Sequence, residues 1–152
     1  MRKAVAVLLV GLCLAGNACA ESATKDECVA KCKEAAQLVT DKGIDEAITE
    51  LNRKDGRFVW KDSYVFMMDL KGTMLAHPIS PKLIGKNLLE TPDKGPDKKL
   101  LFKEFVALAK SKGEGWVDYM WPKPGEETPS KKQTYIYRVP GKDVFVAAGV
   151  YE

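Results

Sequence analysis

Apolar residues follow the helical repeat in the first part of the chain. Between residues 25 and 42 they recur at Val29, Cys32, Ala36 and Val39, with lysines and glutamates between them. Thr24 and Glu27 have the spacing of a capping box at the start of this stretch. Gly43 interrupts the pattern, which then resumes to about residue 53. The span 24–53 is therefore predicted to form one long broken helix or two collinear helices.

Apolar and polar residues alternate in most of the remaining chain, as they do in half-buried strands. Residues 58–60 form a short candidate strand, and 64–69 and 73–77 flank a polar turn as a hairpin. Three more strands are expected at 115–121, 132–139 and 144–151, after an amphipathic helix at 98–112 and a long loop at 78–96. The pattern predicts an α+β domain in which the long N-terminal helix accompanies an antiparallel sheet of five main strands and a further helix.

The first twenty residues have the features of a signal peptide. A basic start is followed by a short apolar run and by Ala18-Cys19-Ala20, which fits signal-peptidase cleavage after Ala20. Lipidation at Cys19 is the alternative, although Asn17 fits a lipoprotein box poorly. No second apolar run reaches about 18 residues, so we expect no membrane span in the mature form and a periplasmic or secreted location.

The charge of the mature chain is close to balanced. Removing Arg2 and Lys3 from 24 basic residues leaves 22 against 21 acidic ones. A balanced, interspersed surface argues against nucleic acid as a partner.

Two cysteines, Cys28 and Cys32, remain after cleavage, at helical i,i+4 spacing. In an oxidising compartment such a pair most often forms a disulfide, which here would require some unwinding of the helix. Free or externally paired thiols and a redox or metal role are the alternatives. Cys32 is followed by Lys33, which excludes a c-type haem motif, and we expect no metal site.

Short motifs occur in an order that resembles a known family. They are Tyr64-x-Phe66-x-x-Asp69-x-x-Gly72, His77-Pro78, Ile84-Gly85-Lys86-Asn87, Gly115-x-Val117-x-Tyr119-x-Trp121-x-Lys123-Pro124, Lys132-x-x-Tyr135 and Gly149-Val150-Tyr151. The set resembles a single Cache domain of the second type, a PAS-like extracytoplasmic sensor domain of bacterial chemoreceptors and sensor kinases. It covers residues 21–152 as one domain, with an N-terminal helix at 24–53 and a sensor core at 56–151. Receptors of this family continue into a transmembrane helix, whereas this sequence stops at Glu152 and begins with a predicted cleavable signal. The expectation here is therefore a stand-alone Cache protein.

The resemblance implies a pocket between the sheet and the long loop that binds a small organic ligand. In this family the ligand is often a short carboxylate such as acetate, propionate, pyruvate or lactate. Carried over by motif position, the implied ligand-binding residues are His77, Lys86, Tyr119, Trp121, Lys132 and Tyr135. The resemblance implies no cofactor.

The chemistry of these residues fits a carboxylate, which needs a cation or several donors beside apolar walls. Tyr119 and Trp121 are two positions apart on one strand and therefore share a face. Lys132 and Tyr135 belong to the next strand, across a hairpin, so an ammonium and a phenol can approach one anion. His77 is placed to donate from the opposite rim.

Each of these residues also has a structural explanation. The two aromatic residues of the first strand can be ordinary core residues. A register slip by one position would bury Lys131 in place of Lys132. His77 can be bonded to the backbone at the strand end, and Lys86 can be a solvated loop residue.

The function predicted is extracytoplasmic ligand binding in signal perception, without catalysis. The sequence has no Gly-x-Ser-x-Gly elbow, no phosphate-binding glycine loop and no His-Glu-x-x-His pair, and it contains 1 histidine. The alternative is an accessory or dimerising scaffold for a membrane receptor or transporter, with enzymatic activity a distant third. In either case the N-terminal helix is the candidate homodimer surface.

Overall fold

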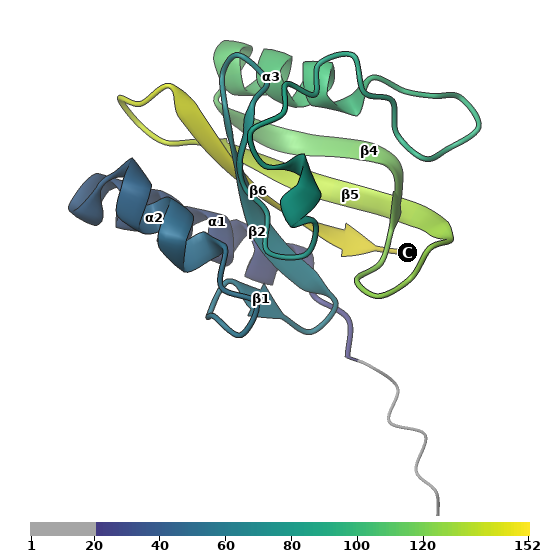
Figure 1. Cartoon of the computed structure of the whole chain (residues 1–152), viewed down its shortest axis with the longest axis horizontal. Helices are drawn as coiled ribbons and strands as arrows, with labels where there is room; N and C mark the ends of the chain where they lie inside the picture. Colours follow the sequence, from purple (N-terminus) through teal and green to yellow (C-terminus); the bar gives the residue numbers. More distant parts are fainter. Residues whose placement is uncertain (1–20) are drawn as a thin grey trace, which may run out of the picture.

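The computed structural model describes residues 21–152, in which helices cover both faces of an antiparallel sheet (Figure 1). The strand order is β1-β2-β6-β5-β4, and β3 pairs with β2 beside this path. The strands are β1 (Val59–Trp60), β2 (Ser63–Asp69), β3 (Met74–Ala76), β4 (Glu114–Pro122), β5 (Pro129–Arg138) and β6 (Val144–Tyr151). The predicted α+β class and the five main strands are confirmed, with the two-residue β1 as a sixth. The predicted signal peptide and the lipidation alternative lie outside the described residues.

The N-terminal helical region is divided at Gly43 into α1 (Lys25–Lys42) and α2 (Ile44–Leu51). The capping box at Thr24 is present, and Gly43 adopts a φ of 89°, which suits glycine. The chain folds back there, so α2 lies beside α1 and the expected collinear arrangement is wrong (Figure 1).

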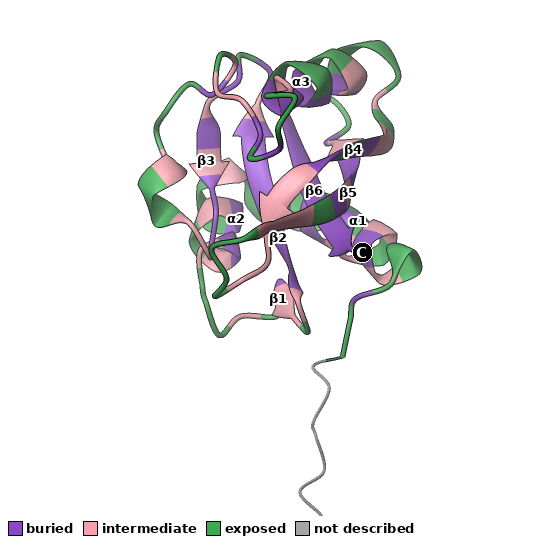
Figure 2. Cartoon of the chain, turned by 90° about the vertical axis from the view of Figure 1, so that its right-hand side faces the viewer, coloured by how far each residue is buried: buried purple, intermediate pink, exposed green. Residues whose placement is uncertain are grey.

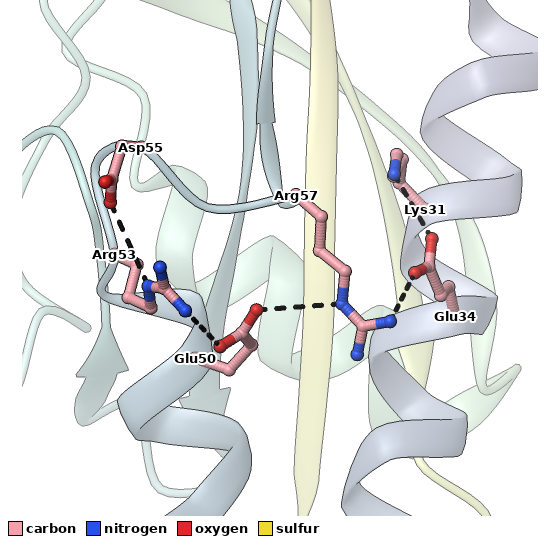
Figure 3. Close-up of polar contacts among 6 residues, drawn as sticks. All are labelled: Lys31, Glu34, Glu50, Arg53, Asp55 and Arg57. Atoms are coloured by element: carbon pink, nitrogen blue, oxygen red, sulfur yellow. Dashed lines mark hydrogen bonds and ion pairs between the residues drawn. The ribbon is translucent and has the colours of Figure 1, made fainter.

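A network of ion pairs joins the two helices (Figure 3). Arg57 lies 3.0 Å from Glu34 of α1 and 3.7 Å from Glu50 of α2. Arg53 also contacts Glu50, at 3.4 Å. These side chains are partly exposed, so the network orients the helices and contributes little to the free energy of folding.

The two faces of the sheet carry separate cores. One face packs against α1 and α2 through alternate residues such as Val65, Met67 and Val146. The other packs against α3 (Leu101–Ser111) through Phe66 and Phe145, among others. Every residue of β6 is buried, because this central strand is covered on both sides (Figure 2).

The long loop before α3 contains a short 3₁₀ helix, η1 (Pro81–Leu83), and then follows the outer edge of β4. The buried carboxylate of Asp93 holds it there by accepting three backbone N–H groups. These belong to Gly95 at 3.1 Å, Lys99 at 3.1 Å and Met120 at 3.0 Å. The loop thus protects an edge strand that would otherwise offer unpaired backbone groups.

The predicted disulfide is not formed, and Cys28 and Cys32 are both buried free thiols. Helix α1 continues unbroken through both positions, which directs the sulfurs to different partners. The sulfur of Cys28 lies 3.9 Å from the hydroxyl of Ser63, and that of Cys32 lies 3.9 Å from the carbonyl oxygen of Tyr135. Among residues 21–152, no helix is both long and apolar enough to cross a bilayer.

Candidate functional site

The strand register places Lys132 in the interior of the protein. On β5 it pairs with Tyr119 of β4 on one side and with Tyr151 of β6 on the other. Its relative exposure is 1%, whereas the neighbouring Lys131 side chain is 75% exposed. The expectation that Lys132 and not Lys131 points inward is confirmed.

The ammonium group of Lys132 is surrounded by phenol rings. Its Nζ atom lies 3.1 Å from the hydroxyl of Tyr64 and 4.4 Å from the centre of that ring. The centre of the Tyr151 ring is 4.6 Å away. No carboxylate forms an ion pair with Lys132 within residues 21–152. Cation–π contacts and one hydroxyl replace only part of the hydration that a buried charge loses.

The charge state of Lys132 depends on these neighbours. Burial by itself lowers the pKa of Lys132, but the phenol oxygens of Tyr119, Tyr64 and Tyr151 reverse this and raise it. Burial also raises the pKa of Tyr119, so its phenol stays neutral and keeps its proton. The site therefore combines a fixed positive charge with neutral hydroxyl donors.

Gly149 of β6 provides the space that the lysine side chain occupies. A Cβ atom at this position would lie 2.6 Å from Cε of Lys132 and 2.4 Å from Oγ1 of Thr134. Both distances are well below van der Waals contact, so any larger residue would displace one of these side chains.

His77 is buried at the end of the strand segment that contains β3, where its ring packs against two aromatic rings. The ring centres of Tyr64 and Phe66 lie 4.8 Å and 5.7 Å from it. Its Nδ1 atom accepts the backbone N–H of Ser80 at 2.9 Å, so Nε2 carries the hydrogen of the neutral ring. Burial and the charge of Lys132 lower the pKa of His77 to about 3. The ring is therefore a neutral donor at physiological pH.

Tyr64, Tyr119 and His77 border a small cavity between the sheet and α3, called here the inner cavity, and Lys132 lies behind the two tyrosines without lining it. Its free volume is about 10 Å³, close to the space of one water molecule. The lining residues are Tyr64, Phe66, Met74, His77, Leu83, Leu101, Phe102, Phe105, Tyr119 and Trp121. The walls are thus largely aromatic, with Tyr64 and Tyr119 connecting the cavity to Lys132.

Two of the six expected site residues lie elsewhere. Tyr135 is three positions from Lys132 on β5, and an odd spacing puts it on the opposite face, where its hydroxyl donates to the carboxylate of Glu114. Lys86 is exposed, and its carbonyl oxygen accepts the N–H of Met74 at 3.1 Å. Neither side chain reaches the inner cavity.

Sequence reasoning missed Tyr64 and Tyr151 as neighbours of the cation. Both occur in the motifs that suggested the family, but strand alternation alone does not show which strands are adjacent. Tyr151 becomes a candidate only when the β5–β6 register pairs it with Lys132.

A family model of the Cache domain (dCache_2) matches residues 29–152. The chain belongs to the Cache domain family. Among relatives, it is 39% identical over 90 residues to the methyl-accepting chemotaxis protein McpP of Pseudomonas putida, and 32% identical over 91 residues to the sensor histidine kinase MctS of Rhizobium johnstonii. These matches cover 59% and 60% of this chain but only 16% and 19% of the two relatives. They relate the chain to a small part of two much longer proteins.

Solved Cache structures share the fold. One, described as the periplasmic sensor domain of a chemotaxis protein, has 30% identity and a TM-score of 0.65, covering 83% of this chain and 88% of that chain. Another, described as the structural basis for carboxylic acid recognition by a Cache chemosensory domain, has 32% identity and a TM-score of 0.65, covering 83% and 86%. The fold and the sensor-domain class are therefore established.

Proposed function

We propose that this Cache domain binds a short organic carboxylate at the inner cavity, as a non-catalytic sensing module in the periplasm or in secreted form. The observation that carries the proposal is the buried ammonium of Lys132, which has no carboxylate partner within residues 21–152. A buried cation without a counter-ion is costly, and an anionic ligand removes that cost when it binds.

The surrounding groups suit the two ends of such a ligand. Lys132 supplies the charge from behind the tyrosines. The neutral donors are the hydroxyls of Tyr64 and Tyr119 and the Nε2–H of His77, with the Tyr119 hydroxyl also sharing a 2.9 Å hydrogen bond with Thr134. Phe102 and Phe105 form an apolar wall that suits a short hydrocarbon tail. We include Trp121 as a wall residue and omit Lys86 and Tyr135 from the proposed site.

The volume of the inner cavity favours a small ligand. With about 10 Å³ of free volume, it accepts even acetate only when lining side chains move apart. Every additional carbon of the ligand therefore requires a larger rearrangement of the aromatic wall. We expect ligands of two to three carbons to bind more tightly than longer ones.

The relatives support the same class of ligand and context. One similar structure is described as recognising carboxylic acids, and the two relatives are a methyl-accepting chemotaxis protein, McpP, and a sensor histidine kinase, MctS. This chain spans only 16% and 19% of those two proteins, so their signalling role is carried over to it only as a proposal. We propose that the domain couples to a membrane receptor. Homodimerisation through α1 stays a prediction.

The test is thermal unfolding of residues 21–152 with acetate, propionate, pyruvate and lactate, each compared with its uncharged amide. Propionate at about 100 times its Kd should stabilise the folded state by about 2.7 kcal/mol, and propionamide should have no effect. Equal stabilisation by propionamide would exclude Lys132 as the recognition element. Failure of every carboxylate to raise the melting temperature would contradict the proposed function.

A further inference from the structure

A second, larger cavity lies directly outside the inner cavity. It has a volume of about 380 Å³ and is bounded by η1 and the adjoining residues 79–80, by Lys94, and by the end of β4 with the loop after it. We call it the outer groove. Tyr64, Leu83 and Trp121 line both cavities and form the partition between them.

The partition contains the most exposed part of the inner wall. Of the residues that line the inner cavity, Leu83 and Trp121 are partly exposed, and the others are buried. On another side, a surface cavity of about 590 Å³ along β4 is lined by Tyr119 and Lys132 together with acidic residues such as Asp97 and Glu152, and it shares only Tyr119 with the inner cavity. The outer groove shares three lining residues with the inner cavity, so we take it as the more direct route from solvent.

The outer groove carries basic side chains that are not engaged in ion pairs. Lys82, Lys94 and Lys123 line it, and none of them forms an ion pair within residues 21–152. The Nζ atom of Lys94 lies 5.8 Å from the ring centre of Trp121, next to the partition. Glu126 and Glu127 line the same groove and are exposed on the loop after β4.

We propose that the outer groove is an anion-capture site, in which Lys82, Lys94 and Lys123 gather carboxylates that then pass Leu83 and Trp121 into the inner cavity. This inference rests on the proposed function for the identity of the ligand. Its physical basis is that a cleft with a net positive charge raises the local concentration of anions and hence their association rate. The two glutamates oppose the lysines, so removing them should strengthen capture.

The capture of anions can be measured without the natural ligand, through iodide quenching of Trp121 fluorescence. Replacing the other two tryptophans (W60F/W116F) leaves Trp121 as the reporter. At low ionic strength, K82Q/K94Q/K123Q should lower the iodide quenching constant about threefold, and E126Q/E127Q should raise it. Quenching by neutral acrylamide should be unchanged in both variants. If W60F/W116F does not fold, the signal lost on W121F substitution in the otherwise native protein provides the same reporter.

A matched control removes three exposed lysines from other regions, as K33Q/K42Q/K112Q. This variant has the same net charge as K82Q/K94Q/K123Q, and its iodide quenching should equal that of the unmodified protein. Equal losses in the two triple variants, or no loss in either, would overturn the proposal.

The passage of carboxylates is measured by stopped-flow mixing with propionate. The K82Q/K94Q/K123Q variant should associate about tenfold more slowly at low ionic strength, with little change in the dissociation rate. At about 0.5 M NaCl the difference should largely disappear. If propionate and the other carboxylates bind but association is unaffected by these substitutions, the proposed entry route is wrong. If no carboxylate binds at all, the proposed function fails, and iodide quenching still decides whether the groove captures anions.

Discussion

The two faces of the sheet differ in the polarity of what they bury. On the side of α1 and α2, the core consists of apolar side chains, two thiols and the hydroxyl of Ser63, and burial raises the pKa of Cys28 to about 11. On the side of α3, the sheet buries Lys132 and Thr134, with His77 and Tyr64 beside them. The same strand, β5, supplies both sides.

This difference shows that alternate residues of the same strand can serve two chemically different cores. The α1 side holds groups that gain stability from exclusion of water, whereas the α3 side holds groups that lose hydration and need a partner. Substitutions on the first face should therefore change the free energy of unfolding, and those on the second should change ligand affinity. The following predictions test this separation, with propionate as the probe.

The largest effect is expected for K132M. Loss of the buried cation should weaken propionate binding roughly 100-fold or more, because charged partners in desolvated sites contribute several kcal/mol. The free energy of unfolding should change little, because the apolar side chain removes the desolvation cost of the ammonium together with its contacts to the phenols. Calorimetric titration and urea unfolding measure the two quantities. K131M is the control, and a comparable loss of affinity in K131M would contradict the separation of faces.

The next effect is expected for G149A, paired with V150A. The alanine Cβ at position 149 collides with Lys132 and Thr134, so we expect a loss of about 1 to 3 kcal/mol in stability and about tenfold in affinity. Val150 faces α1, and V150A should cost a similar amount of stability through a cavity while leaving affinity intact. Affinity lost equally in both variants would show that the two faces are coupled.

A pH dependence should arise from His77. Its pKa is about 3 in the folded state and near 6.5 when unfolded, so the unfolded chain binds more protons between these values. Stability should therefore fall as the pH drops below 6.5, by roughly 2 kcal/mol at pH 5. In H77N the amide oxygen of the asparagine can still accept the Ser80 N–H. The fall in the free energy of unfolding between pH 7 and pH 5 should disappear in this variant, because asparagine does not titrate. Urea unfolding at pH 7 and pH 5 measures this decrease. If the decrease is the same in H77N as in the unmodified protein, titratable groups other than His77 cause it.

The smallest effects are expected for two tyrosine hydroxyls. Y64F removes the hydroxyl 3.1 Å from the Lys132 ammonium and should weaken propionate binding about fivefold. Y135F removes the hydroxyl bonded to Glu114 on the other face and should cost about 1 kcal/mol of stability or less, with affinity unchanged. Calorimetric titration with propionate and urea unfolding measure the affinity and the stability of both variants, which each lose a single tyrosine hydroxyl. Weaker binding in Y135F would return Tyr135 to the site.

The fold was largely predictable because its elements have clear periodicity. Alternation located the strands, and the continuous apolar run at the end of the chain became the strand buried on both faces. The direction in which α2 leaves Gly43 was not predictable, since it depends on packing and on the pairs that Arg57 makes with both helices. Local sequence signals a break in a helix but not the angle that follows it.

The candidate site was predictable only in part. Tyr119, Trp121 and His77 border one cavity, with Lys132 behind it. Tyr119 and Trp121 point to the same face of the sheet, and Lys132 points inward, as the alternation along the strands predicted. Tyr135 is three positions from Lys132 on the same strand, so alternation already places their side chains on opposite faces. The sequence itself therefore contained the reason to omit Tyr135. The role of Tyr64 and Tyr151 required knowledge of which strands are neighbours, and this is set by contacts between distant parts of the chain.

The position of β6 has a consequence for how the domain folds. This strand follows all the others in sequence and yet lies between β2 and β5, so Val65 cannot pair with Ala148 until the last strand has been made. A chain made from its N-terminus cannot assemble the sheet in order, and β1–β3 remain separate from β4–β5 until synthesis of the last strand. Such non-local pairing predicts slow folding, on the millisecond-to-second scale, that is cooperative across the whole domain. It also leaves the apolar β2 exposed to aggregation during synthesis.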